Sequence, residues 1–145
     1  PSLASHFDDT PFGGGLTYSG HPMSLAAAVA NLKVIEEEEL VDRSANMGTY
    51  LDHSLKHLAQ KHKCIGEVRS IGLFGAIELV KDRKTKEVYS KTDPEIKQLE
   101  KWFRSEGLFT VINQNIVMTN PPLCINEKEM SIGFDIIDQG LEKFF

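Results

Sequence analysis

A run of glycines followed by hydroxyl side chains is the part of the sequence best suited to hold a phosphate group. The three glycines at positions 13–15 let the backbone approach a ligand closely. Thr17 and Ser19 then offer hydroxyl donors, and Pro22 suits the first turn of a helix, where its missing N–H costs nothing. Backbone N–H groups and the positive end of a helix dipole favour an anion there. The stretch indicates a phosphate site, with a plain turn before a helix as the alternative.

Histidines and one arginine are the other side chains that invite a chemical role. His21 can titrate near neutrality, but it sits where the helix begins and we assign it a structural role. His53 and His57 lie four residues apart, a spacing that can bind a metal, yet no third ligand accompanies them and we predict a solvated face without metal. Arg69 can pair with a carboxylate through two hydrogen bonds, and we expect a mainly structural role for it.

Charge and composition exclude several classes of protein. The 145 residues carry 16 basic and 21 acidic side chains, a net charge of −5, which argues against nucleic acid as a partner. No apolar run approaches the length of a bilayer span, so no membrane partner is expected. Cys64 and Cys124 lie far apart and lack a metal-binding spacing, which predicts reduced thiols in a cytoplasmic protein.

Hydrophobic spacing predicts helices in the first part of the chain and strands interleaved with helices in the second. Gly48, inside an expected helix, indicates close packing against a neighbour. The order predicts an α+β fold with a small, mainly antiparallel sheet packed with helices. The expected elements are helices at 23–39 and 42–62, strands within 65–80, a charged connector at 82–92, a helix at 94–106, strands at 108–112 and 116–119, and a last helix after residue 126.

Local signals predict where the later helices begin and which side of the last helix is buried. Asp93 is the expected N-cap of the helix at 94–106, and Gly107 its C-cap. Asn126 and Glu129 have the spacing of a capping box. The side chains expected on the buried side of the last helix are Ile132, Ile136, Leu141 and Phe144.

Three stretches resemble class III aminotransferases, the pyridoxal-phosphate (PLP) enzymes that act on ω-amino acids and related amines. Residues 16–22, Leu-Thr-Tyr-Ser-Gly-His-Pro, resemble the segment after the cofactor lysine. Residues 68–79 resemble the first strand pair of the small domain, and residues 120–125 its Pro-Pro-Leu turn before the last helix. Because the three stretches occur in the family's order and span most of the chain, we expect the C-terminal portion of such an enzyme. The branch that it most resembles uses taurine, β-alanine or other ω-amines.

The resemblance implies a fold, a domain organisation and partners. The fold is that of the C-terminal small domain of fold type I PLP enzymes. Residues 1–22 would be a phosphate-loop segment belonging to the large domain, residues 23–62 long linking helices, and residues 63–145 the small domain. The partners would be the protein's own large domain and a second subunit in a homodimer, with an amino donor and a keto acid as substrates.

The resemblance also implies roles for single residues. Thr17 matches the threonine whose hydroxyl and backbone N–H bind the PLP phosphate of the neighbouring subunit, and Leu16 would contribute its main chain. Many members carry an arginine that binds the keto acid's carboxylate some residues before the Pro-Pro-Leu turn. Here Asn113 stands in that region, and an asparagine brings no charge to such a contact. The acceptor preference is therefore expected to differ from the usual one, or another residue binds the carboxylate.

No lysine of the chain matches the context of the Schiff-base lysine, so we predict no catalytic residue here and an inactive fragment. The whole enzyme would transfer an amino group from an ω-amino acid or amine to a keto acid. Two alternatives stay open. One is a non-enzymatic assembly domain derived from the same fold, and the other is an aminomutase or decarboxylase of that fold.

Overall fold

The computed structural model describes residues 2–145, with side chains from residue 4 onward, and its chain forms two compact units. The first ends at Glu38 and the second spans Glu39–Phe145. Between them, the helical backbone is interrupted by a turn at residues 38 and 39, where Glu39 has a φ of 49°. The helix predicted to end at residue 39 therefore ends at residue 37, and the helix predicted to begin at residue 42 begins at residue 40.

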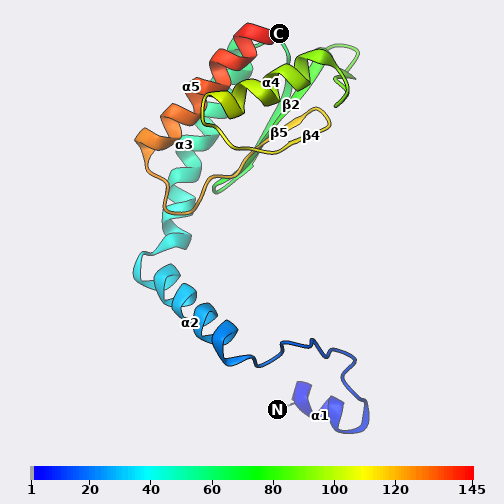
Figure 1. Cartoon of the computed structure of the whole chain (residues 1–145), viewed down its shortest axis with the longest axis vertical. Coiled ribbons are helices and arrows are strands. Elements are labelled where there is room, and N and C mark those ends of the chain that lie inside the picture. Colours follow the sequence, from blue (N-terminus) through cyan, green and yellow to red (C-terminus); the bar gives the residue numbers. More distant parts are fainter. Residues whose placement is uncertain (1) are drawn as a thin grey trace. The chain divides into compact units, whose positions relative to one another are not determined.

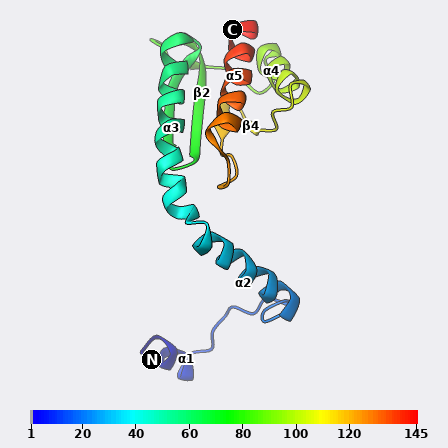
Figure 2. The ribbon, with the colours of Figure 1, turned by 90° about the vertical axis from the view of Figure 1, so that its left-hand side faces the viewer.

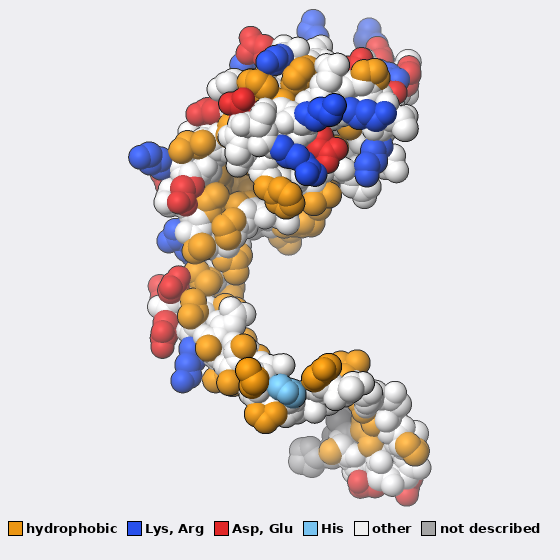
Figure 3. Space-filling model, in the orientation of Figure 1, with side chains coloured by type: hydrophobic (Ala, Val, Ile, Leu, Met, Phe, Trp, Pro, Cys, Tyr) orange, Lys and Arg blue, Asp and Glu red, His pale blue; other side chains and the backbone are white. Residues whose placement is uncertain are grey.

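The first unit contains two helices, α1 (Ser2–Asp9) and α2 (Pro22–Glu37), joined by an irregular segment (Figure 1). Pro22 occupies the first turn of α2, as predicted. None of the residues of α2 is buried, and Leu25, Val29 and Leu32 are each more than half exposed. Figure 3 shows hydrophobic side chains gathered along this helix on the face in view. The helix therefore displays an apolar surface within its own unit.

The second unit is an antiparallel sheet packed against three helices, and this confirms the α+β prediction. The strand order is β1-β2-β5-β4, with the short β3 adding to β2. Helix α3 packs on β1 and β2, α5 lies beside α3, and α4 beside α5 (Figures 1 and 2). The elements are α3 (Leu40–Lys61), β1 (Ile65–Ile71), β2 (Phe74–Asp82), β3 (Glu87–Val88), α4 (Pro94–Ser105), β4 (Ile112–Asn113), β5 (Ile116–Thr119) and α5 (Glu127–Phe144).

The core lies between the sheet and the helices. Leu51 and Leu55 of α3, Ile77 of β2 and Phe103 of α4 are all at most 1% exposed. Gly48 confirms the predicted close packing, because a Cβ there would lie 2.6 Å from the backbone of Gly72 in the β1–β2 turn. The other buried members of this core are Leu58, Ile65, Leu73, Leu79, Ile96, Leu99, Ile112, Val117, Met130, Ile137 and Leu141.

Helix ends follow the local signals with one exception. The capping box at Asn126 and Glu129 is formed in both directions, as predicted. Gly107 comes directly after the capping residue Glu106 of α4 and has a φ of 84°, the left-handed conformation that favours glycine. Asp93 precedes α4 as predicted, but its carboxylate accepts a hydrogen bond from the backbone N–H of Ser90 and caps no amide of the helix.

Two other predictions about elements are wrong in part. The strand expected at 108–112 is reduced to Ile112–Asn113, and residues 108–111 follow an irregular path that keeps a single ladder-like bond from Met118 N to Val111 O at 3.0 Å. On the expected buried side of α5, Leu141 is buried and Ile136 and Phe144 pack against the core, but Ile132 is 52% exposed. Met130 and Ile137 are buried positions of α5 that the prediction missed.

Candidate functional site

The stretch with phosphate-binding character forms a tight turn, called here the phosphate turn (residues 16–20). The backbone N–H of Ser19 donates to Leu16 O at 2.9 Å, and that of His21 donates to Tyr18 O at 3.1 Å. Gly20 has a φ of 74°, which a side chain would strain. These bonds fix the backbone around Thr17 while its side chain stays exposed. A hydroxyl held on a fixed turn can donate to a ligand without reorganising its support.

The start of α2 adds donors next to this turn. No side chain caps the helix, and Pro22 supplies no N–H, so the N–H groups of Met23 and Ser24 have no acceptor inside the helix. Free N–H groups and the positive end of the helix dipole attract an anion. The donors are all neutral, and with the Thr17 hydroxyl their chemistry fits a phosphate group.

His21 lies where α2 begins, and its ring contacts Tyr18. Its ring packs edge-on against Tyr18, with 5.5 Å between ring centroids. Its Nδ1 is buried and has no hydrogen-bond partner within the described part of the chain. A ring wedged in this way supports the shape of the turn.

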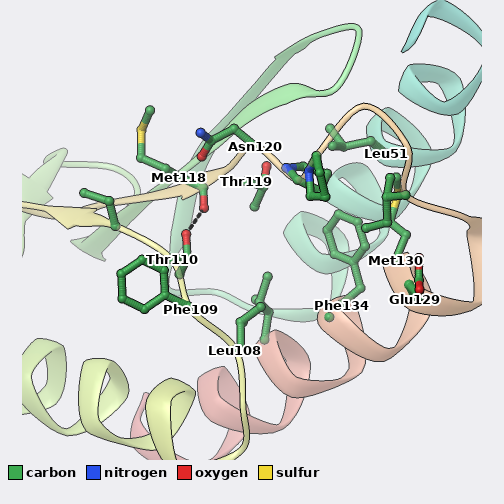
Figure 4. Close-up of a pocket in the computed structure, with 16 residues that line it drawn as sticks. Leu51, Leu108, Phe109, Thr110, Met118, Thr119, Asn120, Glu129, Met130 and Phe134 are labelled. Carbon is green, nitrogen blue, oxygen red and sulfur yellow. Dashed lines mark hydrogen bonds between the residues drawn. The ribbon is translucent and has the colours of Figure 1, made fainter. Parts of the chain in front are cut away.

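The second unit contains an apolar pocket of about 370 Å³ (Figure 4). The irregular segment 108–111, the end of β5, the Pro-Pro turn (residues 120–125) and α5 surround it. Glu129 is the one charged side chain among the described residues that line it. Thr110 donates its hydroxyl to Met118 O, whereas the buried Thr119 Oγ1 has no partner among the described residues. The pocket suits an apolar group better than a carboxylate.

Asn113 lies outside this pocket. It is exposed in β4, pairs with Ile116 across the hairpin, and is followed by Gln114 with a φ of 57°. Val111, two residues earlier, does line the pocket. Thr17 and Asn113 also belong to different units. A role of Asn113 in binding a substrate therefore remains a prediction.

The remaining polar candidates are occupied by structural contacts. Arg69 forms ion pairs with Glu67 and Glu78 at 3.3 and 3.2 Å, which fits its expected structural role. Cys64 and Cys124 are free thiols, and burial raises the pKa of Cys64 to about 11. That thiol is protonated at neutral pH and is a poor nucleophile.

A second, polar cavity of about 420 Å³ lies between α3 and α5. His53, His57, Asp135 and Asp138 are among its lining residues. No group of three or more histidine, cysteine or acidic side chains in the described residues is arranged to hold a metal ion.

No helix in the part of the chain that the structure describes is long and apolar enough to cross a membrane.

Sequence reasoning missed the polar contacts of Asp138 beside the polar cavity. His62 Nε2 and Lys61 Nζ each lie 2.6 Å from an oxygen of Asp138, and this joins the end of α3 to α5. Partial burial raises the pKa of Asp138, but the hydrogen bonds from Lys61 and His62 outweigh burial and bring its pKa below the ordinary value. The partners are 76 and 77 residues apart in the chain, so no local pattern could have indicated them.

Comparison with known proteins extends this description. A worm protein named ethanolamine-phosphate phospho-lyase homolog 1, from Caenorhabditis elegans, is 38% identical over 86% of the chain and 27% of its own length. Isoleucine 2-epimerase of Lentilactobacillus buchneri is also 38% identical, over 86% of the chain and 27% of its own length. The chain thus spans about a quarter of the curated relatives that it matches.

A solved structure shows the same fold over almost the whole chain. Taurine:2-oxoglutarate aminotransferase of Bifidobacterium kashiwanohense, determined in complex with PLP and glutamate, aligns with a TM-score of 0.89 at 30% identity. The alignment covers 97% of this chain and 32% of that enzyme. The family model described as "Aminotransferase class-III" matches residues 5–141, which include both the phosphate turn and the apolar pocket. The chain belongs to the class III aminotransferase family.

Proposed function

We propose that the whole protein is a PLP-dependent aminotransferase that moves an amino group from an ω-amino acid or amine to a keto acid. The observation that carries this proposal is the family match over residues 5–141, which covers the phosphate turn as well as the small sheet. Residues 1–22 would belong to the large domain, residues 23–62 would link the domains, and residues 63–145 would form the small domain. A cytoplasmic homodimer is the proposed assembly.

Thr17 and Leu16 are the proposed contacts to the cofactor. The Thr17 hydroxyl is exposed on a fixed turn and can donate to a phosphate oxygen, together with its own N–H. Leu16, whose side chain is 82% exposed, would contribute through its main chain. PLP, when bound, supplies the electron sink that amino transfer requires. The part of this chain would be to hold the phosphate and so to fix the position of the cofactor.

The second unit would shape the acceptor side of the site. Asn113 can bond to a carboxylate only through a neutral amide, which is a weaker contact than a charged one. The lining of the apolar pocket offers no positive charge within the described residues. We therefore propose that the keto acid's carboxylate is held chiefly by a residue outside this chain.

Another PLP reaction is the second candidate. The names of two relatives denote a phospho-lyase and an epimerase, not aminotransferases, at the same 38% identity. The phosphate turn would serve each of these reactions equally, because it holds the cofactor and does not select the bond that breaks. An assembly domain without activity would need no such turn.

An assay on the whole protein separates these possibilities. The purified protein is loaded with PLP and supplied with taurine, β-alanine or a diamine together with pyruvate or 2-oxoglutarate. We expect the amino product of the keto acid to accumulate, with no racemised or eliminated product. Racemisation or elimination without amino transfer would favour the second candidate over the proposal. A protein that neither binds PLP nor turns over any substrate would support the assembly domain.

The 145-residue chain alone is the matched control. We expect it to show no transfer and no lysine trapped by borohydride in the presence of PLP, because none of its lysines matches the context of the Schiff-base lysine. A stoichiometrically trapped lysine in this chain would contradict that part of the proposal.

A further inference from the structure

Arg43, in the first turns of α3, reaches a turn that lies more than 80 residues further along the chain. Its Nη2 donates to the backbone oxygens of Cys124 and Ile125 at 3.1 and 2.8 Å. Both acceptors belong to the Pro-Pro turn, between β5 and α5. One guanidinium nitrogen therefore joins the start of one helix to the segment that leads into another.

The Pro-Pro turn has few bonds of its own. Pro121 and Pro122 supply no N–H, and the backbone hydrogen bond within the turn runs from Ile125 N to Pro122 O at 3.0 Å. Leu123 and Cys124 are exposed. Asn126 belongs to the capping box and is fixed to α5. Between the end of β5 and this cap, Arg43 provides long-range hydrogen bonds to the turn.

The surroundings of Arg43 argue against a merely incidental surface contact. Its Nε is buried and has no partner among the described residues. No ion pair to a carboxylate is formed by Arg43 within the described chain, so its polar partners are the two carbonyl oxygens. A hydrogen bond from a charged donor is stronger than a neutral one, which suits a single side chain that has to hold a proline-rich turn.

The held segment also forms one wall of the apolar pocket. Pro121, Pro122 and Ile125 line this pocket together with Phe109 and Val111 of the irregular segment. These side chains belong to the Pro-Pro turn, and Arg43 holds the backbone of that turn at Cys124 and Ile125. Any drift of the turn would therefore change the width of the pocket.

We propose that Arg43 is a positioning residue that fixes the Pro-Pro turn and with it this wall of the pocket. Its effect on turnover rests on the proposed function, since it requires the pocket to adjoin the substrate. The tether itself does not depend on that function. The neighbouring Ser44 has a parallel role elsewhere, because its Oγ accepts from Leu73 N at 3.3 Å and holds the β1–β2 turn.

The first test is amide hydrogen exchange in the PLP-loaded whole protein. In Arg43→Met we expect the amide of Ile125, which donates to Pro122 O, to exchange about tenfold faster or more, because the turn that holds this bond loses a hydrogen bond to a charged group. Arg43→Lys keeps a charged donor and should restore part of the protection. Lys56→Met removes a charge from an exposed position of the same helix and should leave exchange of the Ile125 amide unchanged.

Steady-state kinetics on the same variants test the consequence. We expect KM for the amino donor or the acceptor to rise several-fold in Arg43→Met with kcat little changed, and Arg43→Lys to recover part of the loss. Should Arg43→Met fail to fold, Arg43→Lys and Arg43→Gln carry both measurements. Unchanged exchange of the Ile125 amide would overturn the tether. Faster exchange with unchanged KM in an active enzyme would overturn the positioning role. A whole protein without amino transfer contradicts the proposed function, and the exchange result then decides on the tether alone.

Discussion

Helices α2 and α3 follow each other in the chain and both carry apolar side chains at helical spacing, yet they differ in what those side chains contact. Helix α3 buries Leu51, Leu55 and Leu58 against the sheet and its neighbouring helices, whereas α2 buries none of its residues. The predicted cofactor-binding residues lie instead in the unit that contains α2, because the phosphate turn directly precedes this helix. The unit that carries the cofactor-binding pattern buries no hydrophobic side chain among its described residues, whereas the second unit has a core and carries the pocket. Stability measured on this chain should therefore report the second unit almost exclusively.

The largest expected effect comes from opening a cavity in the second unit. Phe103→Ala removes a side chain that is 1% exposed, and we expect the free energy of unfolding to fall by about 3–5 kcal/mol. Val29→Ala on α2 removes a half-exposed side chain and should change it by less than about 0.5 kcal/mol. Urea unfolding followed by the fluorescence of the single tryptophan, Trp102, measures both. Equal losses in the two variants would show that α2 has a hidden core.

Glycines sharpen the same contrast. Gly48→Ala places a methyl group 2.6 Å from the backbone of Gly72, and we expect a loss of about 1–3 kcal/mol despite the better helix propensity of alanine. A Cβ at Gly13 meets nothing within 4 Å, so Gly13→Ala should be nearly neutral. The same urea titration checks the pair. A stabilised Gly48→Ala variant would mean that α3 and the β1–β2 turn can move apart.

The ion pairs of Asp138 make part of the second unit's stability depend on pH. The folded pKa of Asp138 lies below its ordinary value of 3.8, because the hydrogen bonds from Lys61 and His62 outweigh the opposing effect of burial. Its contribution is therefore present above about pH 4 and lost as the pH falls through the folded pKa. Asp138→Asn should cost about 1–2 kcal/mol at pH 7, discounted for partial exposure.

Urea unfolding of wild type and Asp138→Asn at pH 7, 5 and 3 checks this dependence. The difference between the two proteins should be similar at pH 7 and 5 and shrink at pH 3. A difference that grows toward acid pH would contradict the assigned sign.

The smallest expected effect concerns the acceptor. Asn113→Arg in the whole enzyme would add a charged donor for a keto acid's carboxylate, and we expect KM for pyruvate or 2-oxoglutarate to fall by the equivalent of about 1 kcal/mol. Kinetics with both acceptors measure it. Because Asn113 lies outside the pocket and Val111 lines it, Val111→Arg is the informative companion variant. An unchanged or raised KM in Asn113→Arg would show that this position does not face the acceptor.

Features that depend on a few residues close together in the chain could be predicted from the sequence. Asn126 and Glu129 form their capping box because the spacing itself brings the two groups together. Gly48 marks close packing because a side chain would not fit there. The path of residues 108–111 could not be predicted, since their β-forming side chains line a pocket and leave the ladder. Ile132 was misplaced because the helical period does not fix how far around α5 the buried face extends, and Ile132 lies outside it while Leu141 lies within it.

The candidate site divides along the same line. The phosphate turn was proposed from local glycines and hydroxyls and the role of Thr17 from the family resemblance, and the turn's backbone bonds lie within six residues. The contact from Arg43 to Cys124 and Ile125 joins distant segments and leaves no spacing to detect. The pocket wall depends on that long-range contact, so only the folded structure reveals it.

The affinity of the whole protein for PLP in the Thr17 variants tests the central claim most directly. Loss of one hydrogen bond to a charged group costs about 1.5–3 kcal/mol, so Thr17→Ala should weaken PLP binding roughly 10- to 150-fold. Thr17→Ser keeps the hydroxyl and should bind nearly as well as wild type. Titration of the apoprotein with PLP, followed by absorbance, gives both dissociation constants. An unchanged affinity in a well-folded Thr17→Ala protein would contradict the assignment of this turn to the cofactor's phosphate.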